Sequence, residues 1–220
     1  YHSLLRRMEQ RALGKKDEPI VIEEFPGLDG EVAWDPRPIS RDGSERVIRF
    51  AFDYAKHRQR KMGVSQSVTC VDKSNVTRGC QLFRKIFREF AERNQDIMVK
   101  EAYIDAFTMW LVRNPEDLDV VVLPNMFGDI ATDLASVLQG GMGMSASANM
   151  GPKHMLFEPV HGSSPKHAGK NVVNPIAMIQ SVQMMFEALA FRKKDQNLDT
   201  CAEILQSAIQ KHFEEGGIVT

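Results

Sequence analysis

The sequence predicts an α/β fold in which helices flank a mostly parallel sheet. From about residue 44 to residue 139, stretches with a strand pattern alternate with amphipathic helical stretches, as in parallel strands joined by helical crossovers. One predicted strand, "LDVVVLPN", is a continuous apolar run of mostly β-branched residues, which is typical of a strand covered on both faces. The 220 residues are 43% hydrophobic and 26% charged, a globular composition with enough chain for one large domain or two small ones.

The segment before this alternation, residues 1–39, has no sustained period. Its charged start leads into the β-like "PIVIEEF" and then into the turn-rich "PGLDGEVAWDPRP", so we expect an extended arm with one or two strands. A helix is predicted to follow over "SERVIRFAFDYAKHRQRK", with Ser44 as its N-cap. The expected buried face of this helix comprises Val47, Phe50, Ala51, Tyr54 and Ala55.

Three strand–helix pairs are predicted next. Pro115 stops the second of their helices, and glycines close the third. The strands are expected at 64–72, 97–105 and 118–125, and the helices at 78–94, 106–115 and 129–141.

The pattern changes near Gly140, where we place a domain boundary. A long helix is expected to begin with Asn174 at the N-cap and Pro175 at the first helical position, where the missing N–H of proline costs nothing. The other elements expected beyond the boundary are a loop of small residues at 140–154, a strand at 155–162, a second loop at 163–173 and a last helix from Asp199 to Glu214.

Composition and charge exclude several classes of partner. The net charge is −1 and the pI about 6.7, so no nucleic-acid partner is expected. No apolar run reaches membrane-spanning length, so no membrane partner is expected. The three cysteines stand in no metal-binding spacing, which favours reduced core thiols in a cytoplasmic protein. Because the chain starts at Tyr1 rather than at a methionine, we expect a fragment of a longer protein.

Acidic residues follow two of the predicted strands. In "NMFGDIATDLAS", Asp129 and Asp133 lie one helical turn apart, so their like charges share a helix face. Asp105 follows the strand "AYI" in the same way. Carboxyl ends of parallel strands are where open α/β sheets bind ligands, and three converging carboxylates would suit Mg²⁺ or Mn²⁺. The alternative is that one aspartate caps the helix and another is solvated.

Two further segments carry groups suited to chemistry. Lys73 in "VDKSNV" also follows a strand, and beside acids and a dication it would serve as a general acid or base; otherwise it is a surface lysine. The segment "HGSSPKHAGKNVVNP" combines glycines, hydroxyls and lysines that can wrap a phosphate-bearing ligand, although it matches neither common nucleotide fingerprint. His161 and His167 have no partner at metal-ligand spacing.

Several segments together resemble the isocitrate/isopropylmalate dehydrogenase family of metal-dependent oxidative decarboxylases. They are "LPNMFGDIATDLAS", "GGMGMSASANMG" and "FEPVHGSSPKHAGKNVVNP", preceded by "ISRDGSERVIRFAFDYA", "DKSNV" and "YIDAFTMWLVRNP". The resemblance runs from about Ile39 to Gly217 and follows the order of the family. It implies a central substrate, metal and dimerisation domain at 1–139 with an arm at about 18–38, and part of a dinucleotide-binding domain at 140–220.

The resemblance implies a role for each acidic residue and for the lysine. Lys73 would be the catalytic lysine, and Asn75 would contact the substrate or the nicotinamide ribose. In this family the lysine and the first aspartate reach into the active site of the neighbouring subunit, so the resemblance also implies a homodimer. The residues implied as ligands of Mg²⁺ or Mn²⁺ are Asp105, Asp129 and Asp133.

The resemblance further implies a dinucleotide site and a catalytic tyrosine. Tyr1 stands where the family has that tyrosine, although the motif that precedes it there is absent. Members that use NAD resemble "GSAPDIAGK", whereas this chain has Lys166 and His167 in place of the Asp-Ile pair; a lysine attracts the 2′-phosphate of NADP, which favours NADP over NAD. The residues implied to bind the adenosine half are His161, Gly162, Ser163, Ser164, Pro165, Lys166, His167 and Asn174.

The implied reaction is the oxidative decarboxylation of a malate-type 2-hydroxy acid. The resemblance favours 3-isopropylmalate or tartrate/D-malate as the substrate, with isocitrate and homoisocitrate as alternatives. A catalytically inactive regulatory subunit is a second hypothesis, which the presence of Lys73 and the three aspartates opposes. A nucleotide- or metal-binding module with unrelated chemistry is a third, and it leaves the lysine and the acids unexplained together.

Overall fold

The computed structural model describes residues 36–63 and 66–216. Tyr1 and most of the arm expected at about 18–38 lie outside the described residues. The first half of the described chain forms a parallel sheet in the order β2-β1-β3. Its strands are β1 (Ser67–Asp72), β2 (Met98–Tyr103) and β3 (Val120–Val122). Strand β1 is central, and all six of its residues are buried.

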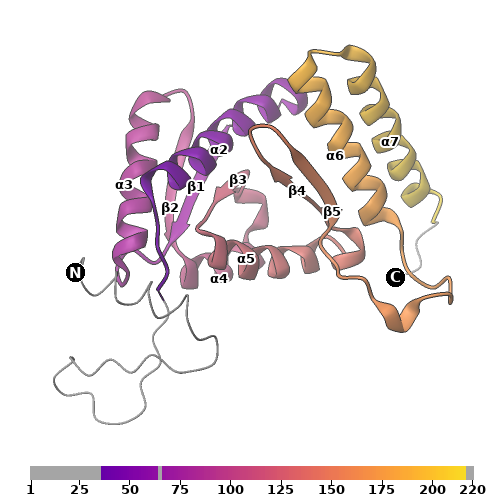
Figure 1. Cartoon of the computed structure of the whole chain (residues 1–220), viewed down its shortest axis with the longest axis horizontal. Helices are drawn as coiled ribbons and strands as arrows, with labels where there is room; N and C mark the ends of the chain where they lie inside the picture. Colours follow the sequence, from indigo (N-terminus) through magenta and orange to yellow (C-terminus); the bar gives the residue numbers. More distant parts are fainter. Residues whose placement is uncertain (1–35, 64–65, 217–220) are drawn as a thin grey trace, which may run out of the picture.

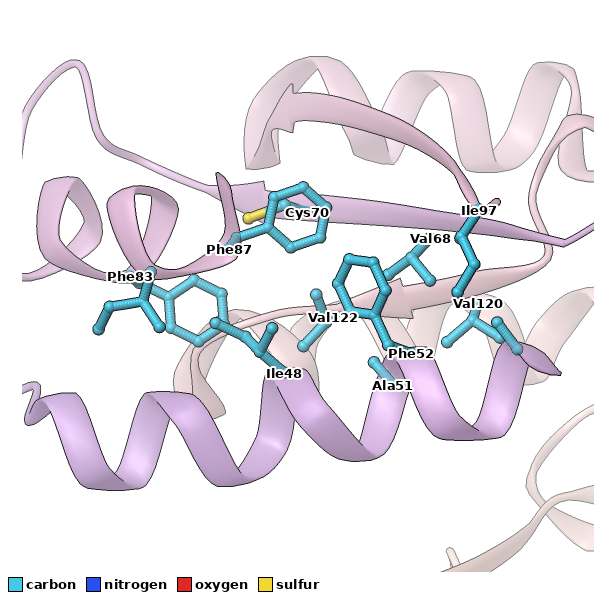
Figure 2. Close-up of a cluster of buried hydrophobic side chains, with 12 residues drawn as sticks. Ile48, Ala51, Phe52, Val68, Cys70, Phe83, Phe87, Ile97, Val120 and Val122 are labelled. Carbon is cyan, nitrogen blue, oxygen red and sulfur yellow. The ribbon is translucent and has the colours of Figure 1, made fainter. Parts of the chain in front are cut away.

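Two pairs of helices cover the two faces of this sheet. On one face lie α2 (Arg41–Met62) and α3 (Arg78–Arg93), and Figure 2 shows their side chains against the strands. On the other lie α4 (Ile104–Arg113) and α5 (Asn125–Leu138). Burial on both faces explains the continuous apolar run of β3. The first core contains Ile48, Ala51, Phe52, Ala55, Val68, Cys70, Phe83, Ile86, Phe87, Ile97, Val120 and Val122, and the second Val71, Ala102, Phe107, Leu111 and Ala131.

The second half of the chain forms a smaller unit. Strands β4 (Ala146–Met150) and β5 (Met155–Pro159) pair antiparallel, and α6 (Ile176–Lys193) packs against them and against α7 (Gln196–Glu214) (Figure 1). Short 3₁₀ turns at Pro115–Asp117, Met142–Met144 and Pro165–His167 complete the described elements. None of the helices in the described part of the chain has the length and apolar character needed to cross a membrane.

Two details of α2 differ from the sequence-based prediction. The helix begins at Arg41 with Ser40 as its N-cap, whose Oγ accepts a hydrogen bond from the N–H of Gly43 at 3.2 Å; Ser44 is a buried residue inside the helix. The face of α2 that packs against the sheet includes Ile48 and Phe52, because the side chains of these residues contact the aromatic rings of α3. Three residues expected in the core are therefore exposed instead: Val47, Phe50 and Tyr54.

The region after Gly140 also differs. The expected loop at 140–154 contains strand β4, whose small residues gave no alternating apolar signal. The long helix starts two residues after Asn174, and the Oδ1 atom of Asn174 still accepts a hydrogen bond from the N–H of Ile176 at 2.9 Å. The last helix starts at Gln196, earlier than expected, because Asp195 caps it.

Candidate active site

The first group of candidate residues lies on α5, which begins directly after β3. Asp129 and Asp133 occupy the same face of this helix and are both exposed. Oδ2 of Asp129 accepts a hydrogen bond from Nδ2 of Asn125 at 3.3 Å. Among the residues that the structure describes, neither aspartate has a lysine or arginine partner, so their charges are free to meet a cation.

These two aspartates line a cavity of about 490 Å³ between α5 and the β4–β5 hairpin. His161 and Gly162, the first two residues of the predicted dinucleotide segment, line the same cavity. The structure thus brings together two groups of residues that the sequence places in different segments. Several other residues of the cavity wall were not predicted from the sequence, although "FEPVHG" contains one acid among them. They include Gln139, Ser145 and Glu158.

The second group lies at the carboxyl ends of β1 and β2. Lys73 follows β1 and Asp105 lies in the first turn of α4, directly after β2; Nζ of Lys73 is 2.7 Å from Oδ1 of Asp105. The hydrogen bond from Lys73 is the main reason that the pKa of Asp105 lies below its ordinary value. Asn75 is exposed on the same turn as Lys73.

The three aspartates expected to converge do not do so within one copy of the chain. The described residues contain no cluster of three acidic, histidine or cysteine side chains that could hold a metal ion. The reason is the sheet order: β2 and β3 lie on opposite sides of β1, so the ends of the two strands are on the order of 10 Å apart. At the carboxyl edge of the sheet, Asp105 therefore lies with Lys73 at one end, and Asp129 lies with Asp133 at the other end.

The segment predicted to bind the dinucleotide is exposed from His161 to Val173, and Asn174 is half-buried. Ser164 adopts a left-handed conformation with φ 45°, which turns the chain into the short 3₁₀ helix that carries Lys166. Oγ of Ser164 lies 2.7 Å from Nδ1 of His167, and this contact supports the turn. Exposed hydroxyls, backbone N–H groups and a lysine are donors that suit a phosphate-bearing ligand.

The donor set of the α5 cavity suits a divalent cation. Two exposed carboxylates on one helix face offer hard oxygen ligands, and their mutual repulsion is relieved when a dication binds between them. Among the described residues, no third acidic, histidine or cysteine side chain joins these two aspartates in a metal-binding cluster.

Comparison with known proteins identifies the family. The model of the isocitrate/isopropylmalate dehydrogenase family matches residues 14–220. The chain is 44% identical over 168 residues to a homoisocitrate dehydrogenase of Methanocaldococcus jannaschii, covering 76% of this chain and 47% of that protein. It is 41% identical over 188 residues to a 3-isopropylmalate dehydrogenase of Archaeoglobus fulgidus, covering 85% of this chain and 54% of that protein.

A solved structure agrees with this match. The crystal structure of isocitrate dehydrogenase from Methylococcus capsulatus superposes with a TM-score of 0.75 at 37% sequence identity, covering 92% of this chain and 56% of that one. The chain spans about half the length of the relatives that it matches. The extent of the sequence match and the shared fold lead to one conclusion: the chain belongs to the isocitrate/isopropylmalate dehydrogenase family.

Proposed function

We propose that the protein carrying this chain oxidatively decarboxylates a malate-type 2-hydroxy acid, using NAD or NADP and Mg²⁺ or Mn²⁺. One observation carries the proposal. Asp129 and Asp133 share a cavity with the start of the dinucleotide segment, while the Lys73–Asp105 pair lies apart from them in the same copy. A site assembled from two copies would contain all of these groups, and a site in one copy would not.

A homodimer is proposed for this reason, and the surface of α4 and α5 supports it. These helices lie side by side on one face of the sheet (Figure 1). They expose several large apolar side chains to solvent, and exposed apolar surface of this kind is typical of interfaces between copies. We propose that this face packs against the same face of a second copy, so that Lys73 and Asp105 of each copy approach the α5 cavity of the other. The apolar side chains concerned are Met109, Trp110, Val112, Met126, Ile130, Val137 and Leu138.

Each candidate residue has a role in this proposal. Asp129 and Asp133 of one copy and Asp105 of the other would hold the cation. When bound, the cation would supply positive charge that lowers the pKa of the substrate hydroxyl, and the dinucleotide would supply the hydride acceptor. Lys73 would take or return a proton at the substrate, as its placement beside Asp105 allows. Asn75, exposed on the same turn, would contact the substrate or the nicotinamide ribose.

The net reaction balances with these parts. The hydroxyl would lose its proton to a base and C2 would lose its hydride to the oxidised dinucleotide, which gives a 2-oxo acid. The bond between C3 and its carboxylate then breaks with release of CO₂, and the resulting carbon takes a proton. Lys73 is a proposed source of that proton, and Tyr1 is proposed as the catalytic tyrosine that shares the role.

The preference for cofactor and substrate is proposed from the sequence. Lys166 is exposed, and its charge would attract a 2′-phosphate, which favours NADP over NAD. Relatives named for 3-isopropylmalate, homoisocitrate and 3-methylmalate support a malate-type acid. We favour 3-isopropylmalate or tartrate/D-malate and keep isocitrate and homoisocitrate as alternatives. The free thiols of Cys70, Cys80 and Cys201 support a cytoplasmic location.

The experiment that tests the function uses the full-length protein with Mn²⁺. Reduction of NAD and of NADP is followed with 3-isopropylmalate, D-malate, tartrate, isocitrate and homoisocitrate in parallel. We expect turnover with one of these acids and its loss when a chelator removes the metal. A folded dimer without activity towards any of them would overturn the proposal and favour a regulatory subunit, whereas turnover that survives the chelator would overturn the role of the metal.

A further inference from the structure

A buried carboxylate lies directly before the candidate catalytic lysine. Asp72, the last residue of β1, is fully buried. Both of its oxygens are engaged: Oδ2 accepts from Nε of Arg84 at 2.8 Å, and Oδ1 accepts from Nη2 of Arg84 at 2.9 Å and from the N–H of Ser74 at 2.7 Å. The bond to Ser74 fixes the turn on which Lys73 stands. The N–H groups of Val76 and Thr77 donate to the carbonyl of Lys73 at 3.0 and 2.9 Å and complete that turn.

The same arginine also holds the end of the neighbouring strand. Nη2 of Arg84 donates to the carbonyl oxygen of Ala102 in β2 at 2.9 Å, and the guanidinium lies 4.9 Å from the centre of the Tyr103 ring. Tyr103 ends β2 and is the N-cap residue of α4, whose first turn contains Asp105. One side chain from α3 thus joins the two strand ends that place Lys73 and Asp105.

Stability alone is a weak explanation for this arrangement. A buried ion pair gains little over well-packed apolar residues, because the cost of removing two charges from water offsets their attraction. Its geometric effect is specific, since the planar guanidinium donates to the carboxylate from two nitrogens and still reaches a carbonyl, whereas a lysine has only one nitrogen from which to donate. The side chain of Arg84 is only 12% exposed, so solvent does not compete strongly for these bonds.

We infer that Arg84 is a positioning residue that, through Asp72 and the carbonyl of Ala102, holds Lys73 and Asp105 in the geometry needed for the reaction. The inference rests on the proposed function, because it assumes that this ion pair acts on a substrate. In the described structure Arg84 forms no hydrogen bond or ion pair with Lys73 or Asp105, and it reaches them through Asp72 and the carbonyl of Ala102; its further ion pair is with Glu101, at 3.7 Å. Lost positioning lowers turnover more than it lowers binding, since a misplacement of about 1 Å at a reacting group costs on the order of a hundredfold in rate.

The test compares Arg84→Met with Arg88→Met in the full-length protein. Arg88 is a matched control because it lies one turn further along α3 and forms a two-bond pair with Glu101, yet has no bond to Asp72 or Ala102 in the described structure. We expect Arg84→Met to lower kcat by about tenfold to a hundredfold with KM for the acid and for Mn²⁺ within about threefold, and Arg88→Met to stay within about twofold in both. A normal kcat in a folded Arg84→Met protein would overturn the inference.

A double variant separates positioning from neutralisation of a buried charge. Asp72→Asn combined with Arg84→Met removes the unpaired carboxylate, so the protein should fold even if Arg84→Met alone does not. The link to Ala102 stays absent, so we expect kcat of the double variant to remain at least about tenfold low. Recovery of wild-type kcat would show that Arg84 only neutralises Asp72 and would overturn the inference.

Hydrogen exchange distinguishes failure of this inference from failure of the proposed function. In Arg84→Met, and not in Arg88→Met, the amides of residues 73–77 and of the first turn of α4 should exchange faster. If the wild type lacks dehydrogenase activity, the proposed function fails, and the exchange result alone decides whether Arg84 holds the strand ends. Unchanged exchange at both segments would overturn the inference whatever the activity.

Discussion

Nζ of Lys73 lies 2.7 Å from Oδ1 of Asp105, although the two residues follow different strands. The contact arises because β1 and β2 are parallel neighbours in which Asp72 pairs with Tyr103, so the residues after both strands emerge at one edge. Asp129 emerges at the same edge but beyond β1, after β3. Within one copy, the order of the strands therefore separates Asp105 from Asp129 and Asp133, and in the proposed dimer a second copy would reunite them.

Mixing two inactive variants tests this division. Asp105→Asn and Asp129→Asn should each abolish Mn²⁺-dependent turnover, since each removes a ligand charge with little change of shape. In a mixed dimer, one site would carry both substitutions and the other would carry neither. Random exchange of subunits at equal amounts should therefore restore about a quarter of wild-type activity.

A second mixture is the control for that experiment. Asp129→Asn and Asp133→Asn lie on the same helix, so every site in their mixed dimer carries one substitution and no activity should return. If the Asp105 and Asp129 variants also failed to complement each other, the shared site would be wrong. If the Asp129 and Asp133 variants complemented each other, the assignment of both to one half of the site would be wrong.

Local sequence patterns predicted most of the fold. The strands and helices of the first half were found because their apolar residues repeat with periods of two and about 3.6, and the family comparison confirms the α/β fold. Strand β4 was missed because small residues such as Ala146 and Ala148 carry no alternating signal. Helix α2 has two apolar stripes, and only the packing of Phe52 against Phe87 decides which of them faces the sheet.

The candidate site could be predicted only in part. Each acid and the lysine were found as residues that follow a strand, but their grouping depends on strand order, which no local pattern contains. Arg84 was missed for a related reason: in the sequence it is one of several charged residues on an amphipathic helix. The sequence did contain a signal for the role of Asp72, because an acidic residue at the end of a strand whose other residues are buried needs a partner for its charge.

Lys166→Asp should change the cofactor preference. An aspartate would repel the 2′-phosphate of NADP and accept hydrogen bonds from the ribose hydroxyls of NAD. We expect the ratio of kcat/KM for NADP to that for NAD to fall by about tenfold to a hundredfold, as loss of a charge-assisted hydrogen bond implies. Lys170→Asp, an equal change of charge in the same exposed segment, is the control and should change this ratio less. An unchanged ratio in Lys166→Asp would show that this residue does not recognise the 2′-phosphate of NADP.

Thiol labelling should distinguish the three cysteines. Cys70 and Cys80 are fully buried, and burial, aided by the charge of Asp72, strongly raises the pKa of the Cys70 thiol, so little thiolate is present. Cys201 is exposed on α7. We expect alkylation of the native protein, mapped by peptide mass spectrometry, to modify Cys201 alone and alkylation after unfolding to modify all three. Rapid labelling of Cys70 in the native protein would contradict the described core.

The pair between Glu101 and Arg88 predicts a small loss of stability in acid. Nε and Nη2 of Arg88 donate to the Glu101 carboxylate at 2.6 and 2.7 Å, and these bonds lower the pKa of Glu101 against the opposing effect of burial. A carboxylate whose pKa is lower in the folded state stabilises the fold above its unfolded value of about 4.3, and this contribution disappears as the pH falls through the folded value. Because both side chains are partly exposed, we expect less than about 1 kcal/mol.

Urea unfolding of the wild type and of Glu101→Gln measures this contribution. The difference in unfolding free energy should be present at about pH 6 and should shrink as the pH falls below about 4, because the protonated glutamate then resembles the neutral glutamine. In an Arg88→Met background the same comparison should give a smaller difference at about pH 6, since the main cause of the lowered pKa is gone. A difference that is constant across this range, or that Arg88→Met leaves unchanged, would show that the pair does not stabilise the fold through the charge of Glu101.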